Sequence, residues 1–176
     1  MLNFAELWQK AVSYQDFLAA SGSHRGLWEG LYRLARIPDW ALVADGERPR
    51  NLLVLVEDWC GDASNTVPIL ARWAAESAKG ELRILRRDEN PEVMDRYLTS
   101  GARSIPIVIV LDENLVELGH WGPRPRELQG WVMENRGVIP KAELYPQVRR
   151  WYARDKGETT LREVLEIGAT PHAILR

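Results

Sequence analysis

The sequence has only one cysteine, Cys60, and no long apolar stretch. A single cysteine excludes an internal disulfide and a cysteine-based zinc site, so Cys60 can act only as a thiol. The longest apolar run, Ile105 to Leu111, is far shorter than the roughly twenty residues needed to span a membrane as a helix. The N-terminus lacks a basic segment followed by an apolar one. We therefore expect a cytoplasmic protein with no membrane partner.

The sequence also lacks a surplus of positive charge. It has 23 Lys and Arg against 25 Asp and Glu, a net charge of -2. Binding to nucleic acid requires clustered basic residues, so no nucleic-acid partner is expected. The three histidines, at positions 24, 120 and 172, share no ligand spacing with acidic residues, and we expect no metal and no cofactor.

The length of 176 residues predicts a single domain over residues 1–176, with segments of different pattern. Residues 1–50 read as a helical extension: an amphipathic helix over residues 3–20, with Asn3 as N-cap and Glu6 as its partner, then a second helix that stops near Pro38. The polar run from Ala44 to Arg50 ends this part.

Residues 51–136 change to buried strands that alternate with helices, which predicts an α/β core with a mixed sheet. The expected order is β-α-β-α-β-β-α, with strands at 51–57, 82–86, 107–111 and 115–118 and helices at 64–78, 92–99 and 123–135. Residues 137–176 read as C-terminal helices, over 140–156 and from a capping box at Thr160 and Glu163 to Gly168. They are either a packing extension or a surface that recruits a partner.

Cys60 lies between the first core strand and its helix, where sites form in α/β folds. A thiol in the first turn of a helix faces free N–H groups and the positive end of the dipole, which favour the thiolate. Asp62 opposes this effect if its carboxylate points inward. The sequence therefore leaves the reactivity of Cys60 open.

Three motifs resemble the thioredoxin superfamily: Trp59-Cys60-Gly61, Pro68 in the following helix, and Ser104-Ile105-Pro106 before the third strand. Together with the order of elements they cover residues 51 to about 135. The flanking helices resemble those of bacterial thioredoxin-like proteins with an N-terminal helical extension. The resemblance implies a thioredoxin fold with helical extensions at both ends. Pro68 is interpreted as a helix kink without chemistry.

The resemblance also implies a site. It makes Cys60 the catalytic nucleophile and Pro106 a cis proline that lies against it, and it leaves the backbone of Ile105 free to pair with an extended peptide. A substrate groove would then be lined by Trp59, Gly61, Asp62, Ile105 and Pro106.

The sequence departs from the family at two positions. Ala63 occupies the place of the second cysteine, and Val54 occupies the place of the buried acid that serves it. A second thiol normally resolves the mixed disulfide at high effective concentration. Without one, dithiol reductase activity is excluded, and any disulfide must be resolved by an outside thiol or a second subunit.

Other candidate residues have simpler interpretations. Glu57 and Asp58 flank the motif and can accept a proton, but strand-end carboxylates are more often solvated. A cysteine peroxidase needs a hydroxyl three residues before its thiol. Glu57 occupies that position in this sequence, which argues against that class of enzyme. Arg124 is read as a surface arginine at a helix start, with contact to a bound anion as the alternative.

Three functions remain open. The first is a monothiol redox protein whose Cys60 forms mixed disulfides with protein or small-molecule thiols. The second is a redox-inactive binding or scaffold protein that keeps the groove beside Pro106, alone or as a homodimer. The third is an oxidation sensor whose Cys60 becomes a sulfenic acid and then joins a second chain.

Overall fold

The computed structural model describes residues 2–43 and 49–169. Most of the predicted polar run at 44–50 and His172 lie outside these residues. The helices in the described part are α1 (Phe4–Lys10), α2 (Tyr14–Ala19), α3 (Arg25–Leu34), α4 (Asp39–Val43), α5 (Gly61–Glu76), α6 (Pro91–Met94), α7 (Arg126–Asn135), α8 (Lys141–Asp155) and α9 (Glu158–Glu166). The strands are β1 (Val12–Ser13), β2 (Arg50–Val56), β3 (Gly80–Arg86), β4 (Ile107–Leu111) and β5 (Glu117–Trp121).

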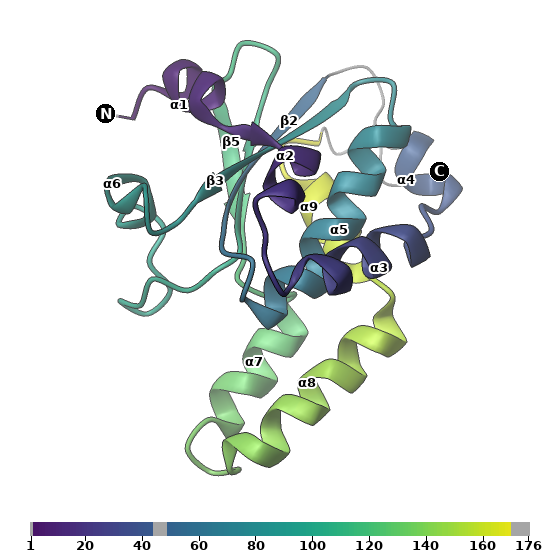
Figure 1. Cartoon of the computed structure of the whole chain (residues 1–176), viewed down its shortest axis with the longest axis vertical. Coiled ribbons are helices and arrows are strands. Elements are labelled where there is room, and N and C mark those ends of the chain that lie inside the picture. Colours follow the sequence, from purple (N-terminus) through teal and green to yellow (C-terminus); the bar gives the residue numbers. More distant parts are fainter. Residues whose placement is uncertain (1, 44–48, 170–176) are drawn as a thin grey trace.

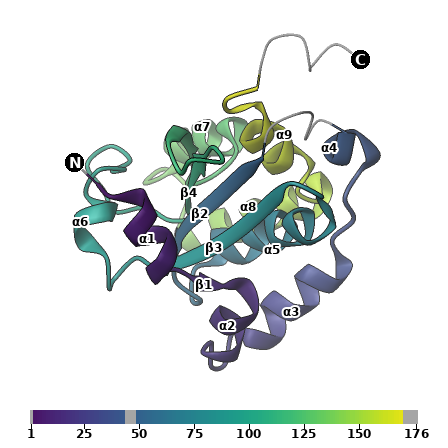
Figure 2. The same ribbon diagram turned by 90° about the horizontal axis from the view of Figure 1, so that it is seen from above.

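The five strands form one mixed sheet in the order β1-β3-β2-β4-β5. β2 and β3 are parallel and are joined through α5, while β4 runs antiparallel to β2 and β5 antiparallel to β4. In Figures 1 and 2, α1 and α6 lie on one side of this sheet and α3 and α5 on the other. The predicted core order of strands and helices is confirmed.

Apolar residues on both faces explain why β2 and β4 occupy the middle of the sheet. All five residues of β4 are buried, as is nearly all of β2. Helix α5 adds a buried face that includes Val67, Leu70 and Trp73. The site therefore rests on rigid elements, because its loops leave the ends of these central strands.

The N-terminal segment differs from the single helix predicted over residues 3–20. Asn3 caps α1 and accepts a hydrogen bond from the Glu6 N–H, as expected. The helix then stops at Ala11, and Val12 and Ser13 pair with β3 as an antiparallel edge strand. Ser13 caps a new helix, α2, through the N–H of Asp16. The prediction was wrong because edge pairing to β3 outweighs the helical spacing.

Several other boundaries also differ from the predictions. The helix expected over 92–99 is the short α6, and the second hairpin strand begins at Glu117, after Leu115 adopts a positive φ of 60°. The capping box predicted at Thr160 is wrong, because Gly157 precedes α9 and Thr160 lies buried within its first turn. The local sequence pattern predicted the wrong ends for these helices and strands, because packing against the rest of the molecule decides where each of them begins and ends.

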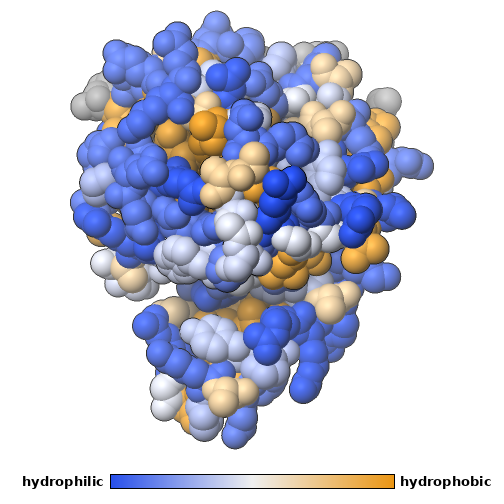
Figure 3. Space-filling view, in the orientation of Figure 1, coloured by the Kyte–Doolittle hydropathy of each residue, from blue (hydrophilic) through white to orange (hydrophobic). Residues whose placement is uncertain are grey.

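The α7–α8 helix pair projects away from the sheet (Figure 1), and it has its own apolar cluster. The cluster consists of five buried residues: Leu128, Val132, Leu144, Val148 and Tyr152. In the space-filling view, a narrowed and hollowed zone separates the α7–α8 helix pair from the rest of the molecule above it (Figure 3). None of the helices within residues 2–43 and 49–169 combines the length and the hydropathy that a membrane-spanning segment requires.

Candidate functional site

Cys60 lies at the predicted junction between β2 and α5, where it is the N-cap residue of α5. The residue is only 8% exposed. The thiol Sγ lies 3.4 Å from the carbonyl oxygen of Ile105 and donates a hydrogen bond to it. The fold thus brings together two segments that are 45 residues apart in the sequence.

The segment opposite Cys60 is built around Pro106, whose peptide bond with Ile105 is cis. Gly122 closes over it, and a Cβ on Gly122 would lie 2.1 Å from the carbonyl oxygen of Pro106. Gly122 also has a φ of +128°, which other residues rarely adopt. Only glycine therefore allows the loop after β5 to approach Pro106 so closely.

The surroundings of Cys60 favour the protonated thiol. Burial is the largest cause that raises the pKa of Cys60, and the Asp62 carboxylate raises it further. Backbone N–H groups of Ala63 and Asp62 and the charge of Arg124 lower the pKa but do not outweigh burial. The helix N-terminus acts in the expected direction, yet desolvation dominates.

The predicted groove residues differ in accessibility. Trp59 is 51% exposed and Gly61 is exposed, while Asp62 is partly buried and Ile105 and Pro106 are buried. The guanidinium carbon of Arg87 lies 5.0 Å from the centre of the Trp59 ring. Trp59 therefore forms an accessible rim beside the sulfur.

Asp62 does not point freely to solvent but is held by three hydrogen bonds. Arg124 forms a bidentate ion pair with it, with N···O distances of 2.8 and 2.6 Å, and the Tyr152 hydroxyl donates to it at 2.9 Å. Gln129 accepts from the other side of Arg124 at 2.9 Å. The interpretation of Arg124 as a surface residue is wrong: its side chain is 18% exposed, and it is paired with a carboxylate of the protein itself.

Tyr152 is a site residue that the sequence did not indicate. It lies on α8, 90 residues from Asp62, and was read as one of several apolar positions of a helix. Burial raises the pKa of the Tyr152 hydroxyl, and the neighbouring Asp62 raises it further. The only sequence signal was a hydroxyl on the apolar face of a helix, which needs a hydrogen-bond partner when buried.

The sequence predicted that Glu57 is a solvated carboxylate at the end of a strand. This prediction is wrong, because Glu57 is buried. It is 5% exposed, pairs with Arg86 at 3.3 Å and accepts a hydrogen bond from the Asp88 N–H at 2.9 Å. The carbonyl of Asp58 accepts a hydrogen bond from the Trp28 indole at 2.9 Å. These contacts fix the loop that carries Cys60.

Ala63, at the position of the missing second thiol, is fully buried, as is Val54. No group of histidine, cysteine or acidic residues within residues 2–43 and 49–169 is arranged to hold a metal ion.

The arrangement of sheet, thiol and proline defines a thioredoxin fold. Two solved structures share it with a TM-score of 0.75: a protein of unknown function from Pseudomonas aeruginosa, 21% identical over 95% of this chain and 97% of that chain, and an HIV epitope scaffold, 20% identical over 94% of this chain and 97% of that chain. At such low identity they show the fold alone.

The sequence profile of a thioredoxin family matches residues 12–141, and the chain belongs to that family. The match begins within the segment predicted as a helical extension, so it exceeds the range 51 to about 135 on which the resemblance was based. No curated protein matches the chain.

Proposed function

We propose that this protein is a thioredoxin-like monothiol exchange protein in which Cys60 forms mixed disulfides with protein or small-molecule thiols. The observation that carries the proposal is the hydrogen bond from Cys60 to Ile105, next to Pro106. In this arrangement the N-terminus of α5 lies on one side of the thiol, and the backbone segment that leads into β4 lies on the other. Such a segment can pair with the backbone of an extended substrate.

The proposed chemistry takes two exchanges. The Cys60 thiol first loses its proton to solvent. Its thiolate then attacks a disulfide R–S–S–R′, so that Cys60–S–S–R forms and R′–S⁻ leaves and takes up a proton. An external thiolate R″–S⁻ then attacks the sulfur of R, which gives R–S–S–R″ and returns Cys60. We assign Asp62 no role as the base, because its carboxylate already accepts three hydrogen bonds from Arg124 and Tyr152.

Substrate contact would involve the residues around the sulfur. Trp59 and Gly61 offer accessible surface, and Ile105 and Pro106 form the buried wall behind it. Asp62 would act indirectly, through its charge and its contacts to Arg124. We assign no cofactor to this exchange.

Turnover of a protein mixed disulfide in the presence of an external thiol tests the proposal. We expect Cys60→Ser to abolish turnover. Ala63→Cys is the matched variant, because it restores a thiol at the position of the missing one and should reduce the dependence on external thiol. Equal turnover by wild type and Cys60→Ser would rule the proposal out.

The burial and raised pKa of Cys60 favour a second candidate, a redox-inactive protein that binds partners at the same groove. In this case wild type and Cys60→Ser would capture the same proteins from a lysate. Capture that requires the thiol would instead support exchange. Labelling by a sulfenic-acid probe under mild peroxide would indicate the oxidation sensor.

A further inference from the structure

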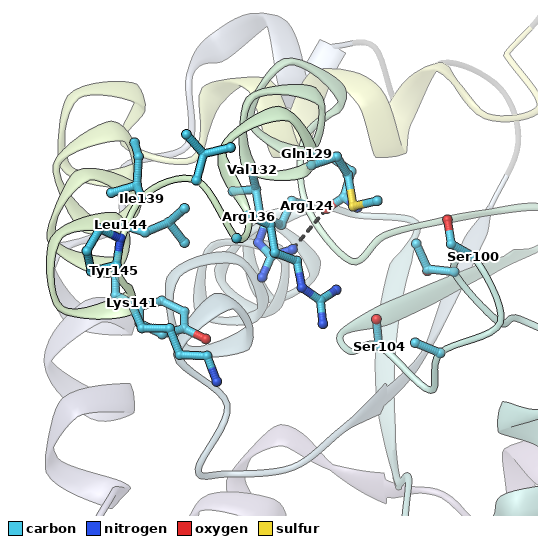
Figure 4. A pocket seen from close by; sticks show the side chains of 16 residues that line it. Ser100, Ser104, Arg124, Gln129, Val132, Arg136, Ile139, Lys141, Leu144 and Tyr145 are labelled. Carbon is cyan, nitrogen blue, oxygen red and sulfur yellow. Dashed lines mark hydrogen bonds between the residues drawn. The ribbon is translucent and has the colours of Figure 1, made fainter.

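A cavity lies between the α7–α8 helix pair and the loop that leads into β4. Its volume is about 600 Å³, within the range of roughly 300–1,000 Å³ typical of small-molecule sites. Figure 4 shows Ser100 and Ser104 on the loop side and Leu144 and Tyr145 on the helix side. We refer to this space as the hairpin cavity.

All charged side chains that line the hairpin cavity are basic: Arg124, Arg136 and Lys141. Arg124 is already paired with Asp62. Arg136 and Lys141 are exposed and take part in none of the ion pairs among the described residues. In Figure 4 the guanidinium of Arg136 extends into the space between the helices and the loop. Because the chain as a whole is slightly acidic, this basic lining is a local feature that favours an anion.

Lys141 is also the first residue of α8, a helix of 15 residues. The N-terminus of a helix carries a partial positive charge, so a lysine there adds like charge. An anion bound in the hairpin cavity would interact favourably with Arg136, Lys141 and this helix end together.

The remaining lining combines polar side chains, among them Ser100, Ser104 and Gln129, with apolar ones. Val132 and Leu144 are 5% and 6% exposed and form the floor. Met133, Val138 and Tyr145 are large apolar residues that remain 46%, 77% and 47% exposed. A ligand that combines a carboxylate with an apolar body would cover these side chains and pair with the basic ones.

The hairpin cavity adjoins the thiol site at two points. Arg124 lines the cavity and also binds Asp62, two residues after Cys60. Ser104 lines it too, and the next residue, Ile105, accepts the hydrogen bond of the Cys60 thiol. Cys60 itself does not line the cavity, but Arg124 and Ser104 connect the cavity to the residues that contact the thiol.

We propose that the hairpin cavity binds a small, partly apolar organic carboxylate, and that this is the recognition part of the disulfide with which Cys60 exchanges. The cavity thus selects anionic substrates. The substrate assignment rests on the proposed function, whereas carboxylate binding by the cavity does not. The exchange itself is unchanged: the carboxylate-bearing thiol becomes R in the mixed disulfide.

Two aromatic disulfide reagents, one anionic and one neutral, test whether the cavity selects anionic substrates. The probe 5,5′-dithiobis(2-nitrobenzoate) is aromatic and carries carboxylates, while 4,4′-dithiodipyridine is aromatic and has none. We expect the double variant Arg136→Gln/Lys141→Gln to slow the reaction of Cys60 with the anionic probe about 10-fold and with the neutral probe less than about 2-fold. Equal slowing with both probes would overturn the proposal.

The matched control is Arg149→Gln/Arg150→Gln, which removes the same charge from exposed positions of α8 that do not line the cavity. It should leave both rates within about 2-fold of wild type. If it slows the anionic probe as much as the cavity variant does, net charge explains the result and the proposal fails.

A measurement without thiol chemistry separates this inference from the proposed function. Cys60→Ser protein is titrated with 2-nitrobenzoate and followed by ¹H–¹⁵N NMR. Saturable shifts at Arg136, Lys141 and Ser104 are expected, even if the exchange function is wrong. An absence of shifts there would overturn the inference, even if Cys60 proves to be redox-active.

Discussion

The two apolar clusters of the molecule are stabilised in different ways. The main cluster surrounds the sheet and draws on nearly every element from α1 to α9, whereas the cluster of the α7–α8 helix pair contains only five buried residues. A small cluster buries too little surface to stand alone. Polar contacts of Tyr152 and Arg124 with Asp62 join the helix pair to the body. The same contacts that dock the smaller region also shape the thiol site.

The largest expected difference comes from the same truncation in each cluster. Leu53 on β2 is fully buried, and Leu53→Ala should lower the free energy of unfolding by about 4 kcal/mol. Leu128→Ala in the smaller cluster should cost about 2 kcal/mol, because the helix pair can close around the lost volume. Urea denaturation measures both. Equal losses would mean that the two clusters are equally rigid.

The junction between the regions depends on Gly122. Gly122→Ala should lower the free energy of unfolding by about 3 kcal/mol, since its Cβ meets the backbone of Pro106. Gly130→Ala on α7 is the control: nothing lies within 4 Å of its added Cβ, and it should stabilise the helix by roughly 0.5–1 kcal/mol. Thermal denaturation of the pair tests this. A well-tolerated alanine at 122 would contradict the close approach to Pro106.

The link through Tyr152 should have a smaller effect. Tyr152→Phe removes the hydrogen bond to Asp62 while Arg124 continues to neutralise the carboxylate, so we expect a loss of about 1 kcal/mol. Hydrogen exchange should accelerate mainly in α7 and α8. Acceleration spread evenly over the sheet would show that the two regions open together.

The smallest expected effect is on the pH dependence of Cys60. Because the pKa of the Cys60 thiol is raised, the thiolate forms later as pH increases, and iodoacetamide alkylation should have its midpoint above the free value of about 8.5. Asp62→Asn removes a charge that raises this pKa, so the midpoint of this variant should lie below that of the wild type. A midpoint below 8.5 in wild type would overturn the assignment of a protonated thiol.

The sequence was a good guide to the body of the fold. Continuous apolar runs predicted β2 and β4, because strands buried on both faces leave a direct trace in composition. Asn3 predicted the start of α1 for a similarly local reason. The sequence did not predict β1, which forms by pairing with the distant strand β3. It also misplaced the ends of β5, where Leu115 has a positive φ and the pairing with β4 shifts register between Val110 and Leu111.

By itself, the sequence determined that the protein has one thiol, no second cysteine to resolve it and an α/β core around it, since these follow from residue identity and local pattern. Only the tertiary structure decided that Cys60 is buried against Ile105, that Asp62 is bound by Arg124 and Tyr152, and that Arg136 and Lys141 face a shared cavity. These features join residues far apart in the chain, and burial and charge at such contacts depend on distances in space that no local pattern encodes.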